Sequence, residues 1–569
     1  MATSAPEAST GAALPMTSSK AAERRRLSSL HKEISKHEEK LTNLQKPTDI
    51  DDVLFDLLKD SEENVPITKF WAALDCTGLR ETDPRLKETR QHFQTMRNQL
   101  AYDTSKSGDS VLDRQRFKDF IHENIVLIGK AFKNQFIIPD FIQFTEQIHD
   151  IYEICKNDRR GKPADYIPQL ARANPDNWGV ALCTVDGQRY SAGDTTIPFC
   201  IQSCSKPLNY ALALTDMGAE KVHSYVGQEP SGRSFNEICL DSSNKPHNPM
   251  INAGAIITSS LLKPTLRIAD RFDYVHSQYK RIAGGEFVGF SNATYLSEKE
   301  TADRNFSLAY YMRENKCFPE NADLVKTLEF YFQLCSVEIT AETGAVIAAT
   351  LANGGICPTT GEKVLTGDAV RNTLSLMYSC GMYDYSGQFA FKCGLPAKSG
   401  VAGAILIVVP NVMGVCTWAP SLDELGNSCR GITFCKELVN KFSFHNYDDL
   451  MHTTKKMDPR SRKADVSAES VVNILFAAAT GDITALRRFV LCGCDMAMSD
   501  YDGRTAMHLG AAEGHMTVLK FLIEKCKVPV NPKDRWGFTP LDDAKRFKHS
   551  EVVNYLQSHK GVESSCLSD

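Results

Sequence analysis

The stretch Cys200-Ile-Gln-Ser-Cys-Ser-Lys-Pro207 decides the fold and carries the chemistry. It places Ser203 three residues before Lys206 and follows a predicted pair of strands, so we expect it to open a helix. Three residues are almost one helical turn, which puts the serine hydroxyl and the lysine amine on one face. A serine becomes a nucleophile when a neighbouring base takes its proton, and a lysine can be that base only when neutral.

A neutral lysine at this position requires an enclosed site. An unperturbed lysine titrates near 10.4, so keeping Lys206 neutral at pH 7 costs about 4–5 kcal/mol. Burial among apolar groups has to supply that energy. The residues alone leave alternatives open, because Ser29-Leu-His-Lys32 matches the same motif, Ser203 suits a helix N-cap and Lys206 suits solvent.

A second motif, Lys398-Ser399-Gly400, opens a strand that we expect beside this helix. The ordered pair S-x-x-K and K-[ST]-G is typical of serine β-lactamases and penicillin-binding proteins. Strand patterns at 178–184 and 188–191, joined by Asp186-Gly187, come early in this region, and two more strands, 402–409 and 412–418, come late.

With helices between these strands, residues 156–446 are predicted to form an α+β domain. One antiparallel sheet is built from both ends of the domain, and a helical lobe is inserted between them. Residues 51–155 show helical periodicity and predict a small helical N-terminal domain. Within it, Asp103 to Arg114 resembles a calcium loop, but Arg114 stands where a bidentate glutamate is needed, which argues against calcium.

An internal repeat predicts ankyrin repeats over residues 469–561. Asp500-Tyr-Asp-Gly-Arg-Thr-Ala-Met-His508 is echoed 34 residues later by Asp534-Arg-Trp-Gly-Phe-Thr-Pro-Leu-Asp542, close to the ankyrin period. Ala477-Ala-Ala-Thr-Gly481 indicates an earlier, degenerate copy. Such repeats predict a protein partner, which the sequence does not name.

The remaining segments carry little pattern. Residues 1–50 predict a disordered tail followed by a short amphipathic helix, 447–468 a linker, and 562–569 a tail.

Composition bounds the function classes. The 569 residues suggest three or four folding units, and 42% apolar and 24% charged residues are ordinary for a soluble protein. A net charge of −5 has the wrong sign for a general nucleic-acid binder. The 18 cysteines are scattered without a C-x-x-C pair, which predicts free thiols and no structural zinc. The best apolar run, Val401 to Val409, is too short to span a membrane.

Five segments resemble the glutaminase family of the animal kidney and liver type, and the order of the domains matches as well. They are Ser203-Cys-Ser-Lys-Pro207, Glu229-Pro-Ser-Gly232, Pro246-His-Asn-Pro-Met-Ile-Asn-Ala-Gly-Ala255, Gly289-Phe-Ser-Asn-Ala-Thr294 and Leu395-Pro-Ala-Lys-Ser-Gly-Val401. The resemblance implies a β-lactamase-like fold. It also implies hydrolysis of L-glutamine to L-glutamate and ammonia through a serine acyl-enzyme, in glutamine catabolism.

The resemblance also implies roles for individual residues. Ser203 matches the nucleophile, Lys206 its base and Tyr383 the tyrosine that relays protons. The backbone N–H of Val401, with that of Ser203, matches the oxyanion hole. The residues that match those holding the substrate, together with Ser203, Tyr383 and Val401, are Tyr166, Asn252, Glu298, Asn305 and Tyr331.

Simpler interpretations stay open for several of these residues. Tyr383 and Tyr331 are also compatible with a hydrophobic core, Asn252 with shaping a turn, and Val401 with an ordinary strand. Lys398 is expected to line the cleft without an assigned role.

Regulation is likewise implied by the resemblance. The family uses no cofactor, is activated by phosphate, and forms homodimers and homotetramers. The segment matching its allosteric loop is Arg233 to Lys245, which contains Phe235, Ile238 and Cys239. Phe235 matches the aromatic anchor of the pocket where allosteric inhibitors of the kidney type bind. Cys239 stands where the kidney type has a second phenylalanine, and Glu237 replaces a lysine. Losing an aromatic ring predicts weak binding of kidney-type allosteric inhibitors.

Family members are commonly mitochondrial, but this N-terminus lacks a clear transit peptide: Glu7 is acidic and the first basic residue is Lys20. The cytoplasm is the alternative.

Two other functions compete with glutamine hydrolysis. One is an ankyrin scaffold with an inactive catalytic domain, against which the intact Ser203, Lys206 and Tyr383 argue. The other is a serine hydrolase of esters or β-lactams, for which a pocket suited to an α-amino acid has no obvious use.

Overall fold

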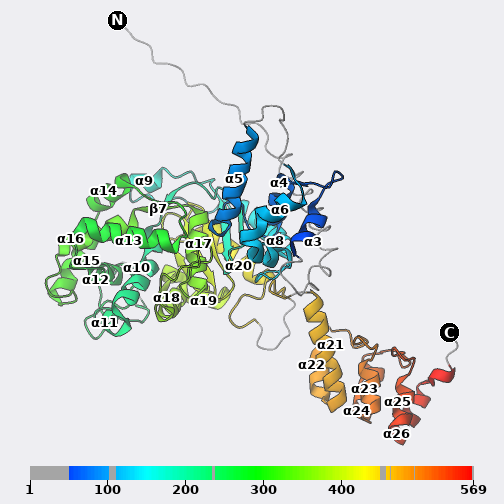
Figure 1. The fold of residues 1–569 in the computed structure, drawn as a ribbon. Coiled ribbons are helices and arrows are strands. Elements are labelled where there is room, and N and C mark those ends of the chain that lie inside the picture. The colour runs from blue at the N-terminus through cyan, green and yellow to red at the C-terminus, as the bar shows by residue number, and fades with distance from the viewer. Residues whose placement is uncertain are drawn as a thin grey trace. The chain divides into compact units, whose positions relative to one another are not determined.

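A computed structural model gives the architecture shown in Figure 1. It describes residues 50–101, 111–232, 237–448, 456–461, 463–491 and 494–566. The chain divides into two compact units, Met1–Lys436 and Glu437–Asp569. The predicted tail and amphipathic helix, up to residue 49, lie outside the described residues, as do residues 102–110 of the loop that resembles a calcium site.

The predicted helical N-terminal domain is confirmed. It contains α3 (Ile50–Leu58), α4 (Ile67–Cys76), α5 (Lys87–Ala101), α6 (Arg114–Ile121), α7 (Ile125–Phe132) and α8 (Phe141–Lys156). Two short strands, β1 (Val65–Pro66) and β2 (Val111–Leu112), pair antiparallel between two helix–loop–helix units. Buried aromatic rings of Phe55, Phe70 and Phe117 meet edge to face in its core.

The main sheet has the predicted antiparallel arrangement, in the order β4-β3-β10-β9-β8. Its strands are β3 (Gly179–Thr184), β4 (Arg189–Gly193), β8 (Ala397–Ser399), β9 (Ala404–Val409) and β10 (Met413–Trp418). Helix α17 (Ala341–Ala352) packs on its centre, where β3, β9 and β10 are buried along their whole length. Gly414 is required there, because a Cβ would lie 2.0 Å from the backbone nitrogen of Ala349.

A second sheet was not predicted. Its three strands, in the order β5-β7-β6, are β5 (Phe199–Cys200), β7 (Val337–Ile339) and β6 (Val288–Phe290). The expectation of a single sheet is therefore wrong, because strands of two or three residues show no alternation in the sequence. Strand β5 directly precedes the segment that carries Ser203, so this small sheet anchors that segment.

The helical lobe lies between β5 and β8 in sequence. Its helices are α10 (Ser205–Met217), α11 (Ala219–His223), α12 (Asn252–Leu261), α13 (Ile268–Ile282), α14 (Asn292–Glu300), α15 (Asp303–Glu314), α16 (Leu324–Cys335), α18 (Gly367–Cys380) and α19 (Ser386–Lys392). Helix α10 packs against α12 and α18, and α12 packs against α15 and α16 (Figure 1). These contacts bring the ends of several helices to one place.

Polar contacts join the N-terminal domain to the main sheet and to α17 within the first unit. Arg80 forms an ion pair with Glu342 at 2.9 Å and donates to Ser191 Oγ at 2.6 Å. Gln188, in the β3–β4 turn, donates to the carbonyls of Thr77 and Ile138 at 2.9 and 3.0 Å. The N-terminal domain thus supports the two-stranded edge of the sheet.

The C-terminal unit carries the repeats. Its helices are α21 (Lys463–Thr480), α22 (Ile483–Leu491), α23 (Ala506–Ala512), α24 (Met516–Lys520), α25 (Pro540–Arg546) and α26 (Ser550–Ser558). Thr505 and Thr539 open α23 and α25 with matching capping boxes, which explains why the repeated motif contains a threonine.

The described helices and contacts at this end overlap the predicted linker and tail. The predicted linker, 447–468, overlaps α21, which begins at Lys463. The first turns of this helix are polar and show no apolar period, so the sequence does not reveal them as helical. In the predicted tail, the carbonyl of Val562 accepts a hydrogen bond from Thr539 Oγ1 at 2.8 Å. Residues 449–455 of the predicted linker lie outside the described residues.

Within the described ranges, no helix is long and apolar enough to cross a membrane, and no group of three or more histidine, cysteine, aspartate or glutamate residues is arranged to hold a metal ion.

Candidate active site

Ser203 lies in a single 3₁₀ turn, η4 (Gln202–Cys204), between β5 and α10. The preceding residue, Gln202, has a φ of +49°, a left-handed conformation that a non-glycine residue adopts at an energetic cost. Lys206 Nζ lies 3.1 Å from Ser203 Oγ, as the three-residue spacing predicts. The Lys206 side chain is 1% exposed, and this burial lowers its pKa to about 8.

Asn252, the first residue of α12, links Lys206 to the helical lobe. Its Oδ1 lies 2.7 Å from Lys206 Nζ and accepts a weaker hydrogen bond from Tyr331 OH at 3.4 Å. Its Nδ2 donates to Asn305 Oδ1 at 3.2 Å. The side chain of Asn252 therefore has partners in the site, which a residue that only shapes a turn does not need.

Glu298, on α14, supplies the negative charge of the site. It is 8% exposed, and its Oε1 accepts from Tyr166 OH at 2.6 Å and from Gln202 Nε2 at 3.0 Å. Burial raises the pKa of this carboxyl, and the two hydrogen bonds oppose the rise. Gln202 was not predicted as a site residue; its only signal in the sequence is its position beside Ser203.

Tyr383 begins the 3₁₀ turn η5 (Tyr383–Tyr385) with a φ of +52°. Ser386 Oγ accepts from Met382 N at 2.9 Å and donates to the carbonyl of Tyr383 at 2.7 Å, which holds this strained backbone. The Tyr383 hydroxyl interacts with Ser203, and burial raises its pKa. The structure thus brings Tyr383 to the predicted nucleophile.

Val401 follows β8, whose end contacts η4. The two segments approach closely at Gly400, where a Cβ would lie 3.1 Å from both the carbonyl oxygen of Ile201 and Cys204 Sγ and would push on them. Cys204 Sγ also donates to the carbonyl of Lys398 at 3.3 Å. The backbone that carries Val401 is therefore held beside the turn that carries Ser203.

Lys398 is fully buried on β8. Its Nζ donates to the carbonyl of Ser399 at 2.7 Å and lies 4.5 Å from the ring centroid of Tyr383. Burial, and next the charge of Lys206, lower its pKa to about 7.

The structure describes only part of the predicted allosteric loop. Phe235 lies in residues 233–236, outside the described residues. Ile238 is 38% exposed and Cys239 is partly buried. The loop is closed at its base by a hydrogen bond from Gly227 N to the carbonyl of Pro246 at 2.8 Å.

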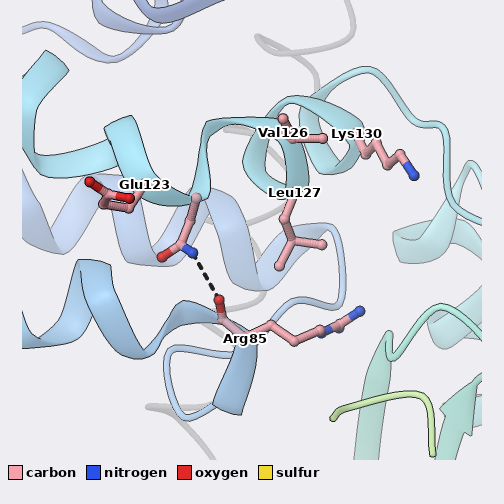
Figure 2. A pocket seen from close by; sticks show the side chains of 6 residues that line it. Arg85, Glu123, Val126, Leu127 and Lys130 are labelled. Atoms are coloured by element: carbon pink, nitrogen blue, oxygen red, sulfur yellow. Dashed lines mark hydrogen bonds between the residues drawn. The ribbon is translucent and has the colours of Figure 1, made fainter. Parts of the chain in front are cut away.

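A separate pocket opens in the N-terminal domain (Figure 2). It is lined by Arg85, Glu123, Asn124, Val126, Leu127 and Lys130. Asn124 Nδ2 donates to the carbonyl of Arg85 at 3.0 Å, and a dashed line marks this bond in Figure 2. No predicted site residue lines it, so we do not connect it with the chemistry.

Three family descriptions match the chain. Residues 161–447 match Glutaminase, residues 50–139 match EF-hand domain, and residues 474–566 match Ankyrin repeats in three copies. The EF-hand match refines the predicted helical domain. Arg114 stands where a calcium loop needs a bidentate glutamate, and it forms ion pairs with Asp52 and Asp56 at 2.7 and 2.6 Å.

Relatives match over most of their length. The mitochondrial liver isoform of glutaminase from Mus musculus is 56% identical over 89% of this chain and 83% of its own. Putative glutaminase 2 of Caenorhabditis elegans is 52% identical over 89% and 85%. Among solved structures, the probable glutaminase YbaS is 36% identical, covers 53% of this chain and 97% of its own, and has a TM-score of 0.51.

Proposed function

The chain belongs to the glutaminase family and is a glutaminase, and we propose that it works through a covalent ester on Ser203 with Lys206 as the base. One observation carries this mechanism: the amine of a fully buried lysine with a lowered pKa lies 3.1 Å from the serine hydroxyl. Lysines are rarely buried without a partner of opposite charge, and this one is placed where a proton has to be taken.

In the first step Lys206 takes the proton of Ser203, and Oγ attacks the side-chain amide carbon of glutamine. The electrons of the C=O bond move to oxygen, and the backbone N–H groups of Ser203 and Val401 stabilise this oxyanion. A preorganised donor of this kind is worth about 3 kcal/mol.

The tetrahedral intermediate then collapses, and its C–N bond breaks. The leaving nitrogen takes one proton, from Lys206 directly or through the Tyr383 hydroxyl, and departs as ammonia. Water next gives a proton back along the same route while its oxygen attacks the ester. Ser203 leaves with that proton, so one glutamine and one water yield one glutamate and one ammonia.

Substrate recognition follows from the charges of the site. Glu298 accepts hydrogen bonds from the α-ammonium group, because it is a buried carboxylate that Tyr166 and Gln202, the residue before Ser203, already orient. Asn305, Tyr331 and the amide of Asn252 donate to the α-carboxylate. A substrate that lacks these groups leaves buried polar partners unpaired, which favours glutamine over esters or β-lactams.

We extend the proposal to the domain bounds, the location and the regulation of the protein. We propose domains close to 50–156, 157–446 and 463–566. We also propose a mitochondrial location, since the mouse and rat relatives are named mitochondrial. Phosphate activation and a homotetramer are proposed from the resemblance of the sequence to the glutaminase family alone. Size-exclusion chromatography with light scattering, with and without phosphate, tests the last two.

Trapping the ester tests the mechanism. The full chain is quenched with acid during turnover of L-glutamine and analysed by peptide mass spectrometry. We expect a glutamyl adduct on the peptide that contains Ser203, present in Ser205→Ala and absent in Ser203→Ala. Ser205 is a matched control, because it is a buried serine two residues away. An adduct on another residue, or one that persists in Ser203→Ala, refutes the assignment.

A further inference from the structure

The tyrosine of the proposed proton relay lies on a strained turn. Tyr383 begins η5 with a φ of +52°, in the left-handed region, which a bulky residue adopts at an energetic cost. Such a conformation persists only where the surrounding structure holds it. The turn that carries Tyr383 therefore needs contacts that keep its main chain in this state.

Strand β8 fixes the start of this turn. Ser399 N donates to the carbonyl of Gly381 at 3.1 Å. A Cβ on Gly381 would lie 1.8 Å from the carbonyl oxygen of Ala397, so the turn runs directly against the strand. This anchor ends two residues before Tyr383, and it does not set the φ of Tyr383 itself.

Ser386, the first residue of α19, closes the turn around Tyr383. Its Oγ accepts from Met382 N at 2.9 Å and donates to the carbonyl of Tyr383 at 2.7 Å. One hydroxyl can do both, because it has a donor and two acceptor lone pairs. Ser386 is 7% exposed, so water has little access to these bonds. The two bonded groups lie on either side of the N–Cα bond of Tyr383, and the hydroxyl therefore resists rotation about it.

Two further contacts reach the turn from the loop after β10. Asn427 Nδ2 donates to the carbonyl of Met382 across a long distance of 3.4 Å. A Cβ on Gly426 would lie 3.8 Å from Cδ2 of the Tyr383 ring, which is an ordinary van der Waals distance. Neither contact bridges the two sides of Tyr383, as the Ser386 hydroxyl does.

We propose that Ser386 is a positioning residue for glutamine hydrolysis: its hydroxyl holds Tyr383 in the left-handed conformation that directs the Tyr383 hydroxyl to Ser203. The proposal rests on the roles of Ser203 and Tyr383 proposed above.

The loss of the Ser386 hydroxyl has two consequences. The N–H of Met382, a residue that is 1% exposed, loses its acceptor in a buried place. Tyr383 is then able to relax to the ordinary right-handed region, which turns its side chain in another direction. A proton relay needs the hydroxyl within hydrogen-bond reach of Ser203, so this relaxation slows turnover.

The test is a double-mutant cycle in the full chain. Ammonia release from L-glutamine gives kcat and KM for wild type, Ser386→Ala, Tyr383→Phe and the double variant, and circular dichroism and thermal unfolding are measured for each. Ser260→Ala is the matched control. Ser260 is also a buried helical serine, and its Oγ donates to the carbonyl three residues earlier, that of Ile257, at 2.6 Å.

We expect Ser386→Ala to lower kcat by about 10- to 100-fold, because a displacement of about 1 Å costs up to about 100-fold in rate. KM stays within about threefold, since the loss falls on the transition state. In the Tyr383→Phe background the same substitution changes kcat by less than about threefold, because the hydroxyl that Ser386 positions is already absent. Ser260→Ala keeps the wild-type kcat.

A second variant carries the cycle should Ser386→Ala not fold. Ser386→Cys fills the place of the hydroxyl, but a thiol is only a weak donor and acceptor. We expect it, too, to lower kcat by about tenfold or more when Tyr383 is present, and by less than about threefold in the Tyr383→Phe background.

Three results overturn the proposal. They are a kcat within about threefold of wild type in folded Ser386→Ala, an equal loss in the two backgrounds, and an equal loss in Ser260→Ala. The last two show that the serine supports the fold and does not act through Tyr383. A wild-type kcat in Tyr383→Phe instead contradicts the proton relay, and ammonia release that survives in Ser203→Ala contradicts the proposed mechanism. The failure of the inference and that of the mechanism are thus distinguishable.

Discussion

Replacing Glu298 by glutamine tests how the site recognises an amino acid. The substitution keeps the shape of the side chain and one oxygen that accepts from Tyr166 OH. It removes the buried negative charge that is expected to pair with the α-ammonium group of the substrate. Gln202 Nε2 donates to the same carboxylate oxygen at 3.0 Å. It keeps an acceptor in the variant only if the new amide places its oxygen, and not its NH2 group, at that position.

The expected loss in kcat/KM follows from the burial of Glu298. Glu298 is 8% exposed, and truncating one partner of a buried, hydrogen-bonded charge pair costs about 2–5 kcal/mol. Because glutamine preserves the shape and one hydrogen bond, we place the loss near 3 kcal/mol, which corresponds to a fall of about 150-fold in kcat/KM.

The assay compares two substrates. One is L-glutamine and the other is 4-carbamoylbutanoate, which has the same side-chain amide and carboxylate but no α-amino group. The Glu298→Gln substitution should lower kcat/KM about 150-fold for L-glutamine and less than about tenfold for the analogue. The analogue has no ammonium group, so it makes no ion pair with Glu298 that the substitution could remove. Glu300→Gln is the control, since Glu300 lies on the same helix and is exposed.

An equal loss on both substrates refutes this reasoning. It shows that Glu298 supports the reacting groups rather than the α-ammonium group. Unchanged kinetics on L-glutamine place the ammonium site elsewhere.

Three further predictions follow from the same structure. Since Lys206 acts when neutral and its pKa is about 8, kcat/KM rises about tenfold from pH 7 to its plateau above pH 9; a profile that is flat over this range contradicts its role as base. Tyr383→Phe lowers kcat by about 10²–10⁴-fold with little change in KM, measured as ammonia release, and wild-type turnover excludes the proton relay. Calcium and a calcium chelator leave activity and unfolding temperature unchanged, because Arg114 pairs with Asp52 and Asp56 where a calcium ligand is needed; a calcium-dependent shift in unfolding temperature disproves this.

The sequence predicts those parts of the site that local spacing determines. Ser203 and Lys206 meet because three residues make almost one helical turn, and Asp186-Gly187 marks the β3–β4 hairpin because the turn needs a positive φ, which Gly187 has at +84°. Two of the repeats are equally visible, since Thr505 and Thr539 cap α23 and α25 in the same way.

The rest depends on contacts between distant segments. Gln202 donates to Glu298 across 96 residues. Lys398 Nζ lies 4.5 Å from the ring centroid of Tyr383, a residue with a φ of +52°. Neither arrangement leaves a periodic signal. The three strands of the second sheet are too short to alternate, so tertiary packing alone defines them.

The most direct test of the central claim is the rate of ammonia release from L-glutamine by the full chain, with and without phosphate. Wild type, Ser203→Ala and Ser205→Ala are measured side by side. We predict that wild type and Ser205→Ala release ammonia at similar rates, and that Ser203→Ala releases none above background while keeping the wild-type unfolding temperature. Ammonia release that survives in a folded Ser203→Ala variant contradicts the serine mechanism.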